Sequence, residues 1–109
     1  AAGRWFTSQF NNDHVDQVNV MLAQLAKTPS EGYAACCEAL SMADLREKVA
    51  SISVPVCIVA GELDPVTTVI DGQFLVEKIS SSRLEVLPAS HLSNVENPQQ
   101  FSEILSRFF

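Results

Sequence analysis

The sequence predicts an α/β fold in which helices come first and two parallel strands alternate with helices afterwards. Three observations support this prediction. Up to about residue 50 the apolar residues recur with a helical period, the run from Val54 to Ala60 is continuously apolar and rich in β-branched residues, and the order after it is strand, helix, strand, helix. A parallel strand pair joined by a helix forms a right-handed crossover. We therefore expect a helical part over residues 1–50, followed by a strand-and-helix part over residues 51–109.

The composition excludes several classes of protein. The hydrophobic fraction is 47%, close to the globular average, and the length of 109 residues allows at most one domain. The net charge is −6, and the seven Lys and Arg residues are scattered, so we expect no nucleic-acid-binding surface. No apolar run approaches the ~20 residues of a membrane span. The first residues, Ala1 to Phe6, contain neither an initiator Met nor a signal peptide, so we expect the sequence to begin within a longer protein.

The three cysteines indicate free thiols in a reducing, cytoplasmic compartment. Cys36 and Cys37 are neighbours in the sequence, and Cys57 lies inside the apolar strand. Adjacent residues of a helix point about 100° apart, which does not favour a disulfide between neighbours. No Cys/His spacing suits zinc. We therefore expect neither a disulfide nor a metal site.

Two helices are predicted before residue 43. Asn12 or Asp13 can cap the first, which runs over about residues 14–26 and ends before Pro29. Ser30 can cap the second, from about Glu31 to Met42. The apolar stripe of the first consists of Val15, Val18, Leu22 and Leu25, and that of the second of Tyr33, Ala34, Cys37 and Leu40.

A third, shorter helix is predicted between residues 44 and 49. Asp44 and Glu47 stand three positions apart, which is the spacing of a capping box at the start of a helix that would run through Val49.

The second half begins with a strand that is buried on both faces. Val54 to Ala60 reads as continuously apolar, as in parallel sheets, whereas a half-exposed strand would alternate. Such a strand needs a neighbour on each edge, so we expect more sheet than two strands, contributed by residues before Ala1 or by another chain.

The remaining elements follow from capping residues and turns. Thr67 or Thr68 can cap a helix to about Ile79, Leu84 to Leu87 forms a short strand, and Asn97 followed by Pro98 begins the last helix. The first of these helices is expected to bury Ile70, Phe74, Leu75 and Ile79. The last carries a complete apolar stripe of Phe101, Ile104, Leu105, Phe108 and Phe109.

An acid and a histidine follow the two predicted strands. Asp64 lies four residues after Ala60, and His91 lies four residues after Leu87. Because the carboxyl ends of parallel strands meet at one edge of the sheet, where ligands bind, we expect the two side chains to lie on neighbouring loops. A carboxylate that accepts the Nδ1 proton of an imidazole leaves Nε2 free to deprotonate a nucleophile. The alternatives are that Asp64, before a proline, is a turn residue and that His91 is a surface residue.

Two sequence stretches resemble a known family. Val54-Pro-Val-Cys-Ile-Val-Ala-Gly-Glu-Leu-Asp64-Pro-Val-Thr resembles the strand and acid loop of α/β-hydrolases. Ala89-Ser-His-Leu-Ser-Asn-Val-Glu-Asn-Pro98 resembles their histidine loop and last helix. Within the second stretch, the motif His-Leu-Ser-Asn-Val-Glu is similar to that of 3-oxoadipate enol-lactonases, which belong to the β-ketoadipate pathway of aromatic-compound catabolism. Arg4-Trp-Phe-Thr and Gly32-Tyr-Ala-Ala-Cys-Cys-Glu-Ala resemble the helical lid of that family.

The resemblance implies what each part of the chain would do. Residues 1–50 would be the last helices of the lid, and residues 51–109 the C-terminal strand-and-helix segment of the hydrolase core. Asp64 would be the acid of a catalytic triad and His91 its base, with no metal or cofactor. Arg4 and Trp5, from the lid-like segment, could line the pocket for a small lactone or ester, the alternative being a solvated charge and a lid-core aromatic. Glu96 is expected to anchor a loop or the last helix.

Nothing in the sequence matches the nucleophilic serine of the resembled family. Ser90 and Ser93 lack the flanking glycines of the Gly-x-Ser-x-Gly turn. Three hypotheses stay open: part of an enol-lactonase, part of another esterase or carbon–carbon bond hydrolase, and a non-catalytic piece that must pair with a missing N-terminal part carrying the serine. On its own the chain is expected to be inactive.

Overall fold

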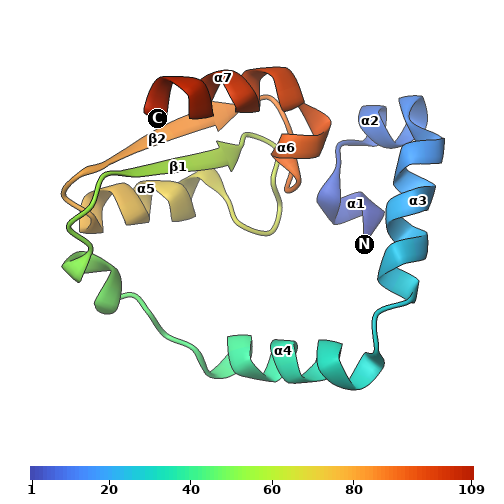
Figure 1. The fold of residues 1–109 in the computed structure, drawn as a ribbon, viewed down its shortest axis with the longest axis horizontal. Helices are drawn as coiled ribbons and strands as arrows, with labels where there is room; N and C mark the ends of the chain where they lie inside the picture. Colours follow the sequence, from blue (N-terminus) through green and yellow to red (C-terminus); the bar gives the residue numbers. More distant parts are fainter.

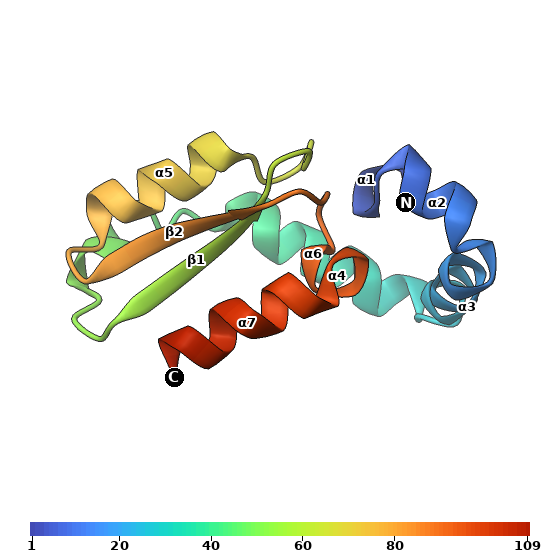
Figure 2. The same cartoon turned by 90° about the horizontal axis from the view of Figure 1, so that it is seen from above.

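The computed structural model describes all residues from 1 to 109 and contains a two-stranded parallel sheet with helices on both faces. Strand β1 (Val56–Gly61) pairs with β2 (Ser82–Leu87), with Val56 opposite Ser82 and Gly61 opposite Leu87. Helix α5 (Val69–Lys78) connects the strands and covers one face, and α7 (Pro98–Phe108) covers the other, as Figures 1 and 2 show. The predicted parallel pair with a helical crossover is confirmed.

Helix α5 begins at a complete capping box and packs closely on the sheet. Of the two predicted caps, Thr67 and Thr68, the N-cap is Thr68, and it exchanges hydrogen bonds with Asp71. A Cβ atom on Gly72 would lie 2.9 Å from Cδ1 of Leu84, so the glycine allows the helix to approach the strands. Ile79 is buried as expected, and Phe74 and Leu75 are half-buried. Ile70 is 74% exposed, so its predicted burial is wrong: it lines an open surface hollow with Leu45 and Val49.

The strand β1 is less covered than its composition predicted. Only Ala60 and Gly61 at its end are buried, and the first four residues are half-buried. Val54 precedes the strand and is exposed. The reason is that β1 has one hydrogen-bonded neighbour, β2, and its other edge carries no strand in this chain.

A small apolar core holds the sheet and the last helix together. It consists of buried Leu87, Ala89 and Ile104, against which Cys57, Val59 and Phe101 pack. Helix α7 starts at Pro98 with Asn97 as N-cap, as predicted. Of its apolar stripe Ile104 is buried, Phe109 is 95% exposed, and the others are half-buried, namely Phe101, Leu105 and Phe108.

Three helices form a second core at the N-terminal end. They are α1 (Ala2–Trp5), α2 (Ser8–Asp13) and α3 (Val15–Ala26), and they bury Phe6, Phe10 and Val18. The first two were not predicted because they are too short to show a period. Asn12 and Asp13 therefore lie inside α2 and do not cap α3, which is a correction to the sequence analysis. Thr7 caps α2 by accepting a hydrogen bond from the backbone N–H of Phe10 at 3.2 Å.

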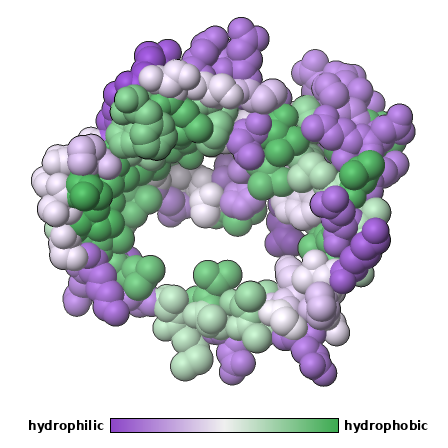
Figure 3. Space-filling view, viewed as in Figure 1, coloured by the Kyte–Doolittle hydropathy of each residue, from purple (hydrophilic) through white to green (hydrophobic).

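Helix α4 (Ser30–Met42) stands apart from both cores. It follows the predicted range, but Ser30 is its first residue, Pro29 occupies the N-cap position, and none of its residues is buried. In the space-filling view an opening passes through the molecule between α4 and the rest, with apolar side chains along parts of its rim (Figure 3). The predicted apolar face of α4 is thus uncovered in this chain.

The segment after α4 is a 3₁₀ turn, η1 (Lys48–Ser51), where a capped helix had been expected. The carboxylate of Asp44 accepts the guanidinium of Arg46 at 2.6 Å and the backbone N–H of Arg46 at 3.1 Å, and these hydrogen bonds lower the pKa of Asp44 to about 2. No helix of the chain is both long and apolar enough to cross a membrane.

Candidate active site

The loop after β1 and the loop after β2 lie against each other at the carboxyl edge of the sheet. The backbone N–H of Glu62 donates to the carbonyl of Leu87 at 2.8 Å, and that of Leu63 donates to the carbonyl of Ala89 at 3.0 Å. A Cβ atom on Gly61 would lie 2.3 Å from the carbonyl oxygen of Ser90, so only glycine permits this approach. These backbone contacts place Asp64 and His91 on adjacent loops, where the strand order predicted them.

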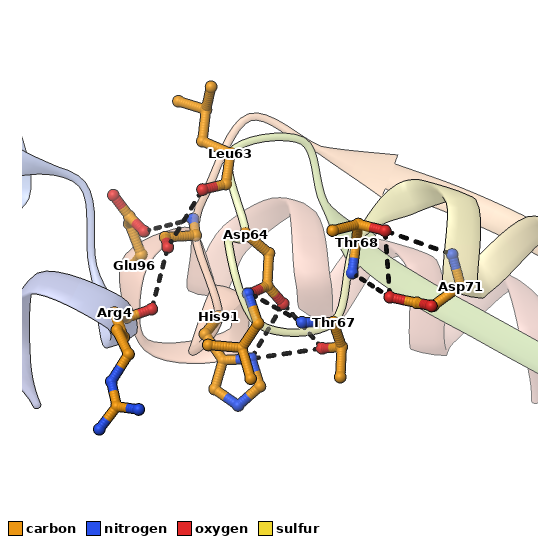
Figure 4. Close-up of polar contacts among 10 residues, drawn as sticks. Arg4, Leu63, Asp64, Thr67, Thr68, Asp71, His91 and Glu96 are labelled. Atoms are coloured by element: carbon orange, nitrogen blue, oxygen red, sulfur yellow. Dashed lines mark hydrogen bonds and ion pairs between the residues drawn. The ribbon is translucent and has the colours of Figure 1, made fainter.

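The carboxylate of Asp64 is buried and fully hydrogen-bonded. Its Oδ1 atom accepts the backbone N–H groups of Val66 at 2.7 Å and Thr67 at 3.2 Å. Its Oδ2 atom accepts the hydroxyl of Thr67 at 2.8 Å and lies 2.9 Å from Nδ1 of His91. The side chain is therefore held in one orientation, aimed at the imidazole, as Figure 4 shows.

The pKa of Asp64 is lowered by this environment. Burial penalises the charged form and by itself raises the pKa of the carboxyl group. Hydrogen bonds from His91, Val66 and Thr67 stabilise the carboxylate and outweigh that penalty. Asp64 is therefore ionised at neutral pH and can accept a proton-donating hydrogen bond from His91.

The imidazole of His91 has one anchored and one free nitrogen. Because Asp64 is ionised, Nδ1 carries the proton and donates it to Oδ2. Nε2 makes no hydrogen bond within the chain, and the side chain is 31% exposed. In Figure 4 the ring extends away from the carboxylate of Asp64. This is the tautomer and orientation in which an imidazole can remove a proton from a neighbouring hydroxyl.

The side chain of Glu96 links the residue before His91 to the N-terminal segment. Helix α6 (Ser93–Glu96) follows the histidine, and the Oε2 atom of Glu96 accepts the backbone N–H of Ser90 at 2.7 Å. The Oε1 atom accepts the backbone N–H of Thr7 at 3.1 Å and also the Thr7 hydroxyl. The expectation that Glu96 anchors a loop agrees with these contacts.

Arg4 and Trp5 approach the histidine loop through their backbone. The carbonyl of Arg4 accepts the hydroxyl of Ser90 at 3.2 Å, and the carbonyl of Trp5 accepts the backbone N–H of Leu92 at 2.9 Å. The guanidinium of Arg4 is exposed, forms no ion pair, and extends away from these contacts in Figure 4. Trp5 is half-buried and packs edge-on against Phe6. The structure brings these residues beside the site, with no hydrogen bond or ion pair between their side chains and His91.

The chain contributes no nucleophile to Nε2 of His91. The hydroxyl of Ser90 is buried and donates towards the carbonyls of Arg4 and Leu63. No group of three or more His, Cys, Asp or Glu side chains is arranged to hold a metal ion. The arrangement can therefore orient and charge-stabilise a base, and it needs a partner hydroxyl from elsewhere.

Comparison with known proteins identifies the fold. Two enol-lactonases of Acinetobacter baylyi are similar to the chain. 3-Oxoadipate enol-lactonase 2 is 53% identical to it over 99% of the chain and 42% of the lactonase. 3-Oxoadipate enol-lactonase 1 is 50% identical over 96% of the chain and 40% of the lactonase. The crystal structure of the enol-lactonase from Burkholderia xenovorans LB400 superposes with a TM-score of 0.94, at 33% identity over 96% of the chain and 40% of that protein. This chain has the C-terminal part of an α/β-hydrolase fold. It resembles the 3-oxoadipate enol-lactonases, as the sequence indicated.

The chain spans about two fifths of the length of these enol-lactonases. No protein-family model matches it.

Two residues of the site were not anticipated. Thr67 was considered only as a helix cap, yet its hydroxyl binds the carboxylate of Asp64. Its position three residues after an aspartate is a turn spacing that could have indicated this contact. Gly61 was expected only to lie in a loop. Its close approach to the backbone of Ser90, 29 positions away, leaves no signal in the neighbouring sequence.

Proposed function

We propose that this chain provides the acid and the base of a serine-type hydrolase, and that the full-length protein opens 3-oxoadipate enol-lactone to 3-oxoadipate. The observation that carries the proposal is the hydrogen bond between Asp64 and Nδ1 of His91 at 2.9 Å, with Nε2 left free. The similarity to two enol-lactonases over nearly the whole chain supports the choice of substrate.

In this mechanism the chain's two residues act in sequence on a serine from the rest of the protein. Nε2 of His91 takes the serine proton while the serine oxygen attacks the lactone carbonyl, and Asp64 stabilises the imidazolium that forms. When the tetrahedral intermediate collapses, the ring C–O bond breaks and His91 returns the proton to the enol oxygen. His91 then removes a proton from water, which attacks the acyl-enzyme, and the acyl C–O bond to serine breaks as His91 returns that proton to the serine oxygen. The released enol tautomerises to the ketone, which gives 3-oxoadipate.

Arg4 and Trp5 are proposed to face the substrate. The guanidinium of Arg4 is exposed and unpaired, so it is available to a substrate carboxylate, which an arginine binds well. Trp5 presents half of its surface beside the loop that holds His91. The three unpaired cysteines support a cytoplasmic location for the reaction.

The test is to purify the full-length protein and measure hydrolysis of the enol-lactone and of a series of aromatic esters. We expect the highest kcat/KM for the enol-lactone. A higher value for the aromatic esters would overturn the lactonase assignment and favour another esterase on the same scaffold.

A second proposal concerns residues 1–109 alone, which we expect to be inactive. It is supported by the absence of a hydroxyl at Nε2 of His91, by the free edge of β1, and by the uncovered face of α4. Purified residues 1–109 should show no lactone hydrolysis and should self-associate in light scattering, whereas addition of the complementary N-terminal part should restore turnover. A monodisperse 109-residue monomer that hydrolyses the lactone would contradict this expectation.

A further inference from the structure

The carboxylate of Glu96 joins two segments that are far apart in the sequence. One oxygen accepts the backbone N–H of Ser90, next to His91, at 2.7 Å. The other accepts the backbone N–H of Thr7, 89 positions away from Glu96, at 3.1 Å, together with the Thr7 hydroxyl. One side chain therefore holds three donors, two of them in the segment from Arg4 to Thr7, defined here as the N-terminal strap.

The same strap also binds the other side of the histidine. The backbone N–H of Leu92 donates to the carbonyl of Trp5 at 2.9 Å. His91 is thus bracketed by two backbone hydrogen bonds, one through Glu96 and one directly to the strap. The strap is therefore linked by hydrogen bonds to both neighbours of His91.

Asp64 is fixed by different contacts. Its carboxylate is held by backbone groups of Val66 and by Thr67, on its own loop. The two loops thus have different side-chain anchors, in addition to the backbone hydrogen bond from Leu63 to Ala89 that joins them. Glu96 contributes to the position of the histidine loop, because its carboxylate is the only side chain that binds a backbone group of Ser90 or Leu92.

We infer that Glu96 is a positioning residue that couples the N-terminal strap to the alignment of His91 with Asp64. The inference rests on the proposed function in taking His91 as the base. It extends that function because the strap carries Arg4 and Trp5. A substrate that binds either side chain would therefore also affect the alignment of His91. An ionised carboxylate suits this role, since both of its oxygens accept, whereas a glutamine amide would set one N–H group against a backbone N–H.

The test compares Glu96→Ala and Glu96→Gln with Glu103→Gln in the full-length protein. Glu103 lies on α7, where its only hydrogen bond comes from the Gln99 side chain, so it controls for loss of a surface carboxylate. We expect Glu96→Ala to lower kcat by about 10- to 100-fold, the scale expected for a misplaced catalytic group. KM should change far less, Glu96→Gln should fall between, and Glu103→Gln should match the wild type.

A spectroscopic readout separates this inference from the identity of the substrate. In protein labelled with ¹⁵N-histidine, the hydrogen-bonded Nδ1 proton of His91 gives a downfield signal, assigned by its loss in His91→Gln. We expect that signal to broaden or move upfield in Glu96→Ala and to stay unchanged in Glu103→Gln. If the wild type shows the signal but no lactonase activity, the proposed function fails while the test of Glu96 still stands.

Two results would overturn the inference. One is a folded Glu96→Ala protein whose kcat stays close to the wild-type value, and the other is an unaltered Nδ1 proton signal in that variant. If Glu96→Ala does not fold, the same two criteria apply to Glu96→Gln, which keeps the size of the side chain.

Discussion

The Nδ1 atom of His91 lies 2.9 Å from the Oδ2 atom of Asp64, although 27 positions separate the two residues in the sequence. The parallel pairing of β1 and β2 brings their loops together, with Gly61 opposite Leu87 at the end of the register. The pair is thus a product of strand order, and the loops that hold it are attached to the most buried part of the sheet.

Replacement of the carboxylate of Asp64 by an amide should disable the base. Asp64→Asn keeps the size of the side chain but favours the wrong imidazole tautomer, and in a serine-protease triad the corresponding change costs about 10⁴-fold in kcat. We expect a loss of that order in kcat of the full-length protein. Asp71→Asn is the matched control: Asp71 accepts the N–H of Thr68 in the capping box at 2.7 Å, so the change should lower stability by about 1 kcal/mol and leave turnover close to wild type. A loss below about tenfold, or about 1.4 kcal/mol, in Asp64→Asn would make Asp64 a turn residue only.

The hydroxyl of Thr67 should contribute to the orientation of Asp64. It donates to Oδ2 at 2.8 Å and also lies 3.3 Å from Nδ1 of His91. Hydrogen bonds to charged groups contribute about 1.5–3 kcal/mol, so Thr67→Val should lower kcat by about tenfold or more. Thr67→Ser keeps the hydroxyl and should restore most of the turnover. Equal activities of the valine and serine variants would contradict a contribution of the hydroxyl to turnover.

The lowered pKa of Asp64 should appear in the acid stability of the protein. The unfolded-state pKa of an aspartate is about 3.9 and the folded value is lower, so the carboxylate contributes stability above about pH 4 that is lost as the pH falls through the folded value. The difference in unfolding free energy between wild type and Asp64→Asn should therefore be constant near pH 5 and shrink on acidification. Denaturant unfolding at a series of pH values measures it. A difference that does not vary with pH would mean that the folded and unfolded pKa values are equal.

The close approach of the two loops should make Gly61 intolerant of a side chain. A Cβ atom there would meet the carbonyl oxygens of Ser90 at 2.3 Å and Ala89 at 2.6 Å, and backbone atoms cannot move aside cheaply. We expect Gly61→Ala to destabilise the full-length protein by about 1–3 kcal/mol or more and to lower turnover, because the histidine loop is displaced. In Gly72→Ala the nearest atom is the flexible end of Leu84, and the helix gains about 1 kcal/mol, so the net change should be smaller. Thermal unfolding measures the stability of both variants. Equal losses of stability would contradict the prediction that Gly61 is the less tolerant position.

Much of the strand-and-helix part could be predicted because its signals are local. The apolar run of β1, the capping threonine of α5 and the Asn97–Pro98 start of α7 each define an element through residues that are close in sequence. The helical part was predicted less well. Helices α1 and α2 have four and six residues, so no period is visible, and their ends follow from packing around Phe6 and Phe10.

The sequence by itself determined the order of the elements, the parallel pairing they imply, and the order of acid and histidine at one edge of the sheet. These depend on periodicity, capping and chirality, which act over a few residues or through the handedness of the crossover. Only the tertiary structure decided that Glu96 binds Thr7, that Gly61 must lack a side chain, and that α4 is left uncovered. The physical reason is that each depends on groups many positions apart in the chain, whose approach is set by packing and leaves no pattern in the neighbouring residues.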